Sequence, residues 1–229
     1  MSFDAPLPPY NASDPSATFL NSSCLDLLMI ELVPMAYRVV NEVDAATLEA
    51  SDAGIVAKAG HDSVKSSSVV SNVRDGGGAT AARTGGKGKM DEDEERDAVF
   101  FRLELLGYRV GQGLVERFSR DRPRFTDTLD VIKFLCKDLW MLVFRKQIDN
   151  LKTNHRGVYV LTDNSFRPFA RMSTEAGGQA VIKAQPFLWF PCGIIRGALA
   201  SMGINATVHA ETSDLPGATF QIKSIVAKS

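Results

Sequence analysis

The distribution of aromatic residues divides the chain into two unequal parts. None of the 13 Phe, four Tyr or two Trp residues lies between Tyr37 and Phe100. That interval also holds the runs KSSSVVSNVRDGGGATAARTGGKGK and MDEDEER. A segment of this composition does not bury enough apolar area to offset the entropy lost on ordering. We therefore expect a disordered insert over residues 41–96, with residues 97–229 forming the main part of a single domain.

The residues before this insert predict an arm and one helix. Residues 1–21 are rich in Pro and Ser and lack the basic start and apolar run of a signal peptide, so we expect a flexible arm. Ser22 or Ser23 can cap a helix over residues 22–40. Its apolar residues recur at spacings of three and four, at Leu25, Leu28, Leu32, Met35 and Val39. Pro34 lies inside this pattern, where it is expected to kink or restart the helix.

The stretch LLGYRVGQGLVERF, residues 105–118, contains three glycines but has a helical period. Apolar residues recur on one helix face at Leu103, Leu106, Val110, Leu114 and Phe118. A dinucleotide-binding loop needs a third glycine where Glu116 stands and a strand before it, and neither is present. We predict a helix in which Gly107 and Gly111 let another helix approach closely, at a cost of ~1 kcal/mol per helical glycine.

The remaining elements predict an α+β fold. The stretch LDVIKFLCKDLWMLVFRKQI, residues 129–148, is apolar around most of its circumference and is expected to be a buried helix. Two hairpins follow from period-two patterns, GVYVLTD with SFRPFARM and NATVHAETS with GATFQIKSIVA. Between them, CGIIRGALASMG predicts a helix after Pro191 that ends at Gly203. The expected fold is a four-stranded antiparallel sheet packed against several helices.

Charge and motifs exclude several functional classes. The formal net charge of −1 gives no electrostatic footprint for nucleic acid. The most apolar stretch is interrupted by Lys137 and Asp138 and is shorter than the about 20 residues needed to span a bilayer, so any membrane contact is expected to be peripheral. Neither H-E-x-x-H nor G-x-S-x-G occurs, and the three histidines, His61, His155 and His209, do not cluster. We predict no catalytic residues, no cofactor and no metal.

The three cysteines lie too far apart for a disulfide framework or a zinc site, which favours a reducing, cytoplasmic compartment. Cys136 is expected in the core. Cys192 has two interpretations: at a helix start its thiolate is stabilised, which suits a reactive or acylated cysteine, whereas its apolar neighbours favour a buried, inert one. The second interpretation is the stronger.

Four motifs together resemble a known family. LGYRVGQGLVERF, LDVIKFLCKDLW, VFRKQIDNLKTNHRGVYVLTDNSF and CGIIRGAL are similar to the small subunits of the TRAPP (transport protein particle) vesicle-tethering complex, in its subunit-six branch. The resemblance runs from Phe100 to Lys223. It implies a non-catalytic structural or adaptor subunit of the α+β TRAPP fold, which pairs as a heterodimer with another small TRAPP subunit through its first two helices.

The resemblance also implies a cellular setting. The other partners would be larger TRAPP subunits and, indirectly, a Rab GTPase, for which the complex is a guanine nucleotide exchange factor. The setting would be transport from endoplasmic reticulum to Golgi, and autophagy, with a cytoplasmic subunit peripheral at both membranes. Acylated relatives carry a cysteine before the DVI helix, where this chain has Arg122, so we expect no acyl chain.

The apolar stripes of the first two helices are the expected dimer interface. Its predicted residues are Leu28, Leu32, Met35, Leu103, Leu106, Val110 and Leu114. The alternative function is a small-molecule- or acyl-binding sensor domain of similar fold. Such a domain needs an interior cavity, and the apolar helix over residues 129–148 favours a filled core instead.

Overall fold

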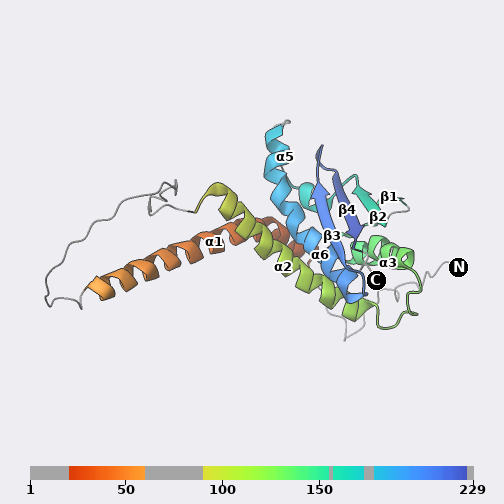
Figure 1. Ribbon diagram of the computed structural model, residues 1–229. Helices are drawn as coiled ribbons and strands as arrows, with labels where there is room; N and C mark the ends of the chain where they lie inside the picture. The colour runs from red at the N-terminus through yellow and green to blue at the C-terminus, as the bar shows by residue number, and fades with distance from the viewer. Residues whose placement is uncertain (1–20, 60–89, 155–156, 173–177, 226–229) are drawn as a thin grey trace, which may run out of the picture.

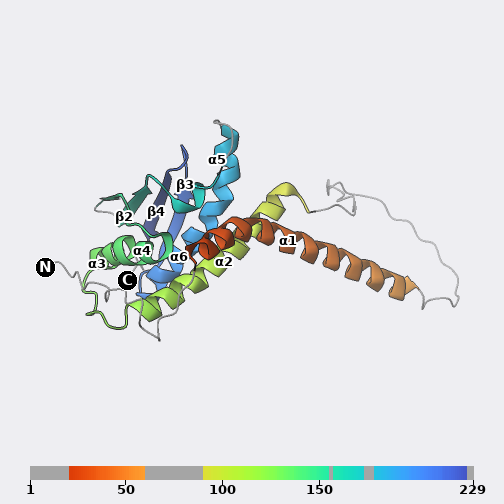
Figure 2. The ribbon, with the colours of Figure 1, turned by 180° about the vertical axis from the view of Figure 1, so that it is seen from behind.

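The computed structural model describes residues 21–59, 90–154, 157–172 and 178–225. They form a four-stranded antiparallel sheet packed against helices, which confirms the predicted α+β fold. Figures 1 and 2 show helix α2 lying across the body of the domain next to α6, while the second half of α1 projects away from the sheet.

Helices α1 (Ser22–Ala59) and α2 (Glu92–Phe118) extend into the segment that we expected to be disordered. α1 does not end at residue 40 but continues as one helix, with Pro34 inside it. Residues 41–59 contain many alanines and no proline, and such a sequence forms a helix without an aromatic core. Residues 60–89 of the predicted insert, and residues 1–20 of the predicted arm, lie outside the described residues.

A hydrogen bond joins the two ends of the predicted insert, residues 41 and 95. The Asn41 side chain donates to the Glu95 carboxylate, with Nδ2 and Oε1 2.7 Å apart. Four acidic residues occupy the first turn of α2, where they complement the helix dipole, and Asp91 caps that turn through its side chain. These local interactions stabilise the start of α2. The prediction of disorder counted the same charged residues only as a sign that the segment lacks a core.

The buried helix predicted over residues 129–148 is present but shorter and divided. It consists of α3 (Thr128–Phe134), a π-helical turn η1 (Leu135–Leu139) and α4 (Trp140–Phe144). Arg145 ends it in a left-handed conformation with φ 62°. The residues that follow then lead into the first strand.

The strands are β1 (Asn150–Thr153), β2 (Val158–Asp163), β3 (Ala206–Glu211) and β4 (Ala218–Ser224), in the order β1-β2-β4-β3. The β3–β4 hairpin is the one predicted, with Val208 opposite Ile222. Along β4, buried Phe220 and Ile222 alternate with exposed Gln221 and Lys223, so one sheet face meets the core.

The first predicted hairpin was wrong. β2 pairs with β1 rather than with SFRPFARM, and Arg167–Phe169 of that run form a 3-10 helix, η2. Pro168 cannot donate a hydrogen bond to a strand ladder. The Asn164 amide instead donates to the Asp149 carboxylate. β1 escaped prediction because its sequence, NLKT, has one apolar residue and shows no alternation.

The last predicted helix begins earlier than expected. Helix α5 (Gly178–Ala184) and a 3-10 turn η3 (Gln185–Leu188) lead into α6 (Trp189–Ser201). Pro191 therefore lies in the first turn of α6, where its missing amide hydrogen has no helical partner to lose. Gly203, with φ 80°, follows the helix end as predicted.

Two apolar cores hold these elements. The larger lies between the sheet, α3–α4 and α6, and its largest side chains are Trp140, Phe166 and Phe220. Within it the fully buried Asp163 carboxylate accepts from Trp140 Nε1 at 2.9 Å and from Lys146 Nζ at 2.6 Å, which offsets the cost of burying its charge. The smaller core joins α1, α2 and α6 at Leu32, Val33, Ala36, Val40, Val99, Leu103, Trp189, Phe190 and Ile194.

Candidate protein interaction face

Helix α2 meets α6 backbone to backbone through two pairs of glycines. A Cβ atom on Gly107 would overlap the carbonyl oxygen of Phe190, and one on Gly111 would overlap that of Ile194. On α6, a Cβ on Gly193 would meet Glu104 and one on Gly197 would meet Tyr108 in the same way. The glycines of α2 were predicted to receive another helix, and that helix is α6 of the same chain.

A partly buried ion pair crosses the same contact. The Arg196 guanidinium binds the Glu104 carboxylate with both Nε and Nη2, and Nη2 lies 2.6 Å from Oε2. Arg196 also lies 4.6 Å above the Tyr108 ring. The single charge of α6 thus fixes its register against α2.

Helix α1 packs against a different part of α2. One predicted interface residue from each helix is buried in this contact. Leu32 is 6% exposed and Leu103 is 1% exposed, and both belong to the smaller core. Leu114 is half-buried against both cores. A helical period identifies an apolar face but not the neighbour that covers it, so the sequence could not separate these three residues from the exposed ones.

Four of the predicted interface residues remain exposed. On α1, Leu28 is 55% and Met35 40% exposed; on α2, Leu106 and Val110 are each 38% exposed. We call these four residues the α1–α2 face. Leu28 and Met35 are two turns apart and Leu106 and Val110 one turn apart, so each pair projects from one side of its helix. Several large apolar side chains on these helices, Leu27, Ile30, Phe101 and Leu105, are also exposed and were not predicted.

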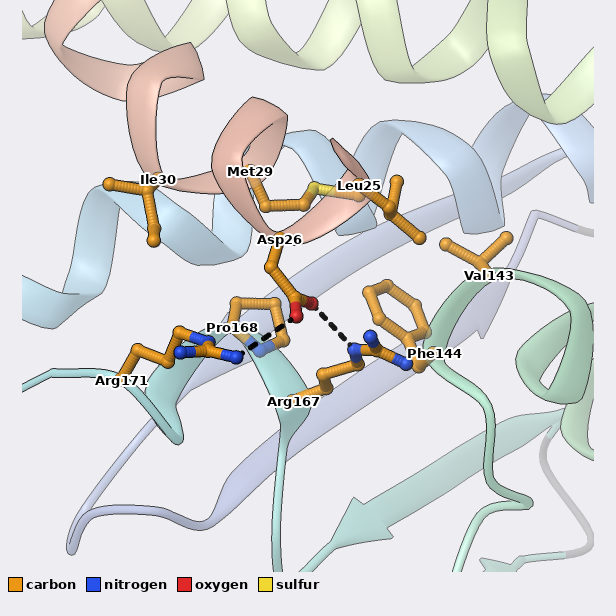
Figure 3. Close-up of a pocket in the computed structure, with 9 residues that line it drawn as sticks. All are labelled: Leu25, Asp26, Met29, Ile30, Val143, Phe144, Arg167, Pro168 and Arg171. Carbon is orange, nitrogen blue, oxygen red and sulfur yellow. Dashed lines mark hydrogen bonds and ion pairs between the residues drawn. The ribbon is translucent and has the colours of Figure 1, made fainter. Parts of the chain in front are cut away.

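A small hollow lies where α1 begins, beside η2 (Figure 3). Asp26 of α1 points to Arg167, with Oδ1 and Nε 2.8 Å apart, and to Arg171, with Oδ2 and Nη2 3.5 Å apart. The hydrogen bond from Arg167 lowers the pKa of Asp26 below its ordinary value of 3.8. The hollow has a volume of about 20 Å³, enough for one water molecule and too small for an acyl chain.

Within the described ranges, the cysteines and His209 form no reactive cluster. Cys136 and Cys192 are buried, and burial raises the pKa of each thiol to about 12, whereas Cys24 is exposed. This agrees with the interpretation of Cys192 as inert. His209 is exposed on β3, and His61 and His155 lie outside the described residues. Among the residues that the structure describes, no group of His, Cys, Asp and Glu is placed to hold a metal ion.

Arg122, which stands where acylated relatives were expected to carry cysteine, is held by its neighbours. Its Nη2 atom lies 2.6 Å from Oδ1 of Asp138, and its guanidinium lies 4.9 Å above the Phe134 ring. The helices within the described ranges include none long and apolar enough to cross a membrane.

Comparison with known proteins gives a family match over most of the chain. The family model described as transport protein particle (TRAPP) component matches residues 25–225. Trafficking protein particle complex subunit 6b of Danio rerio is 52% identical over 130 residues, which cover 57% of this chain and 82% of that protein. Subunit 6B of Homo sapiens is 54% identical over 128 residues, covering 56% of this chain and 80% of its own length.

A solved structure, trafficking protein particle complex subunit 3 from Naegleria fowleri covalently bound to palmitic acid, superimposes with a TM-score of 0.48 at 15% identity. It covers 58% of this chain and 84% of its own. Because the family model spans both cores and all four strands, the chain belongs to the TRAPP component family.

Proposed function

We propose that this chain is a non-catalytic structural subunit of a TRAPP complex, cytoplasmic and peripheral at Golgi and endoplasmic reticulum membranes. It pairs as a heterodimer with another small TRAPP subunit through the α1–α2 face. In this role it supports the complex's guanine nucleotide exchange activity on a Rab GTPase during transport from endoplasmic reticulum to Golgi. The names of the related subunits 6b and 6B support membership of a trafficking complex.

The observation that carries the proposal is the exposure of Leu28, Met35, Leu106 and Val110 on two neighbouring helices. Burying apolar surface contributes roughly 25 cal/mol per Å², so a partner that covers these side chains gains affinity from them. Exposed apolar side chains that gather on one face are typical of protein interfaces. The alternative, an acyl-binding sensor, needs a cavity, and the hollow beside Asp26 is too small for an acyl chain. A larger hollow of about 290 Å³ lies at the turn between β3 and β4, and its lining of Thr, Ser, Asn and Asp side chains suits an acyl chain poorly.

Coexpression with each of the other small TRAPP subunits, followed by size-exclusion chromatography, tests the pairing. Leu106→Asp should abolish heterodimer formation, because pairing would bury an unpaired charge. Leu105→Asp is the matched control: Leu105 is 40% exposed, close to the 38% of Leu106, but projects from another side of α2. Equal heterodimer yields from both variants would show that the interface lies elsewhere.

The role in exchange has its own assay. A reconstituted TRAPP complex with and without this chain is mixed with its Rab loaded with a fluorescent guanine nucleotide, and nucleotide release is followed. We expect faster release with the chain present, and no release from the chain alone. An unchanged rate would remove the exchange role while leaving the pairing intact.

A further inference from the structure

Gly113 is a helical glycine that faces open space in the described structure. It is exposed, and a Cβ atom built on it would meet nothing within 4 Å, unlike Gly107 and Gly111, which receive α6. Glycine is disfavoured inside a helix relative to alanine because it loses more backbone freedom on folding. The packing of this chain therefore explains two glycines of α2 and leaves the third unexplained.

Gly113 lies on the same line along α2 as the exposed apolar residues of the proposed interface. Leu106, Val110, Gly113 and Arg117 are spaced four, three and four residues apart, which is the spacing of a seam that receives one neighbouring helix. All four are exposed. A small residue in such a seam is where two helices can approach most closely. We call these four residues the α2 seam.

Arginines flank the α2 seam. Arg102 and Arg109 are seven residues apart, on the edge of the seam where coiled coils carry the charged residues that select a partner. Both are exposed, as is Arg117 at the end of the seam, and within the described part of the chain none of the three forms an ion pair. Their charges are therefore available to a carboxylate from outside the chain.

We propose that one helix of the partner subunit packs along the α2 seam, comes closest at Gly113, and carries acidic side chains opposite Arg102 and Arg109. This inference rests on the proposed heterodimer and specifies the chemistry of its partner: an amphipathic helix whose apolar stripe is bordered by Asp or Glu. The glycine provides close approach and the arginines provide selectivity, because a helix bordered by Lys or Arg would meet like charges.

Enlarging Gly113 tests the close approach, since the position is open in the free chain. Gly113→Ala and Gly113→Trp should leave the free chain folded, and Gly113→Ala should raise its melting temperature. With the partner that the wild type selects, Gly113→Ala should raise the Kd at least tenfold and Gly113→Trp should abolish pairing. Gln112→Trp adds the same side chain at the adjacent exposed position on another side of the helix, and should pair as the wild type does.

Charge reversal tests the second part. The double variant Arg102→Glu with Arg109→Glu should weaken pairing at least tenfold and lose the salt dependence of the wild type. Arg120→Glu with Arg124→Glu, which changes net charge equally in the exposed segment after α2, should keep wild-type affinity. If the first pair binds as tightly as the second, the acidic partner is ruled out.

The outcomes separate this inference from the proposed function. If the wild type pairs and both Gly113 variants pair equally well, the seam is wrong and the heterodimer stands. If the wild type pairs with no small subunit, the heterodimer fails and the inference fails with it. If Gly113→Trp proves unfolded by circular dichroism, the Kd of Gly113→Ala decides between the first two results.

Discussion

The backbone of Gly197 touches the backbone of Tyr108 so closely that a Cβ atom on the glycine would overlap the tyrosine's carbonyl oxygen. This contact joins the middle of α6 to the middle of α2, beside the ion pair of Arg196 with Glu104. Because both contacting groups are main chain, neither can turn aside to make room. The α2–α6 pair is thus a fixed frame on which the α1–α2 face and the α2 seam are built.

Gly197→Ala should therefore destabilise the chain. Overpacking against backbone costs about 1–3 kcal/mol, whereas Gly113→Ala, at an open helical position, should stabilise by up to ~1 kcal/mol. Urea unfolding followed by circular dichroism measures both. A Gly197→Ala variant with the wild-type midpoint would mean that the two helices stand further apart than described here.

The ion pair between α2 and α6 should show an asymmetry between its partners. The Glu104 side chain is 11% exposed and the Arg196 side chain 40% exposed. Arg196→Met leaves the buried carboxylate without its partner and should cost about 2–3 kcal/mol, while Glu104→Gln leaves a guanidinium that water can reach and should cost about 1 kcal/mol. Unfolding free energies of the two variants at pH 7 test this order. A larger loss for Glu104→Gln than for Arg196→Met would contradict the predicted asymmetry.

The cysteines should differ in reactivity. Burial raises the pKa values of the Cys136 and Cys192 thiols to about 12, so neither is ionised or accessible near neutral pH. In the native chain at pH 8, a thiol reagent should modify Cys24 alone, and all three cysteines should react in denaturant. Mass spectrometry of the digested product identifies the sites. Rapid native labelling of Cys192 would be incompatible with its burial.

The Asp26 ion pair should give the stability a dependence on acid pH. The hydrogen bond from Arg167 lowers the pKa of Asp26 in the folded chain below 3.8, so this contribution is present above pH 3.8 and is lost as pH falls through the folded pKa. Asp26→Asn should be less stable than wild type at pH 7, and the gap should close at lower pH. Urea midpoints between pH 7 and pH 2 measure the gap, which should narrow only below pH 3.8. Arg167→Met should weaken this pH dependence, with the part due to Arg171 remaining. A gap between wild type and Asp26→Asn that stays constant with pH would exclude the Asp26 ion pair as its source.

Much of the fold could be predicted because the local patterns agree with the tertiary contacts. The helix around Leu103 and Leu114 follows from a period of 3.6 and the β3–β4 hairpin from a period of 2, while the helix after Thr128 follows from its nearly continuous apolar sequence. The first hairpin could not be predicted, since β1 is short, polar and recognisable only by its pairing with β2. Residues 41–59 and 92–96 were predicted to be disordered but are helical. The prediction relied on the lack of aromatic residues, which indicates that a segment contributes little to a core, and a projecting helix forms without such a contribution.

At the α1–α2 face, the sequence and the tertiary structure each determine different properties of the same residues. The sequence by itself determined that Leu28, Leu32, Leu103 and Leu106 lie on apolar helix faces, and that Gly107 and Gly111 receive a helix. The tertiary structure alone decided that α6 is that helix, that Leu32 and Leu103 are covered by their own chain, and that Leu28, Leu106 and Gly113 are left open. The physical reason is that periodicity describes a face relative to its own helix axis, whereas burial depends on which other element packs against that face.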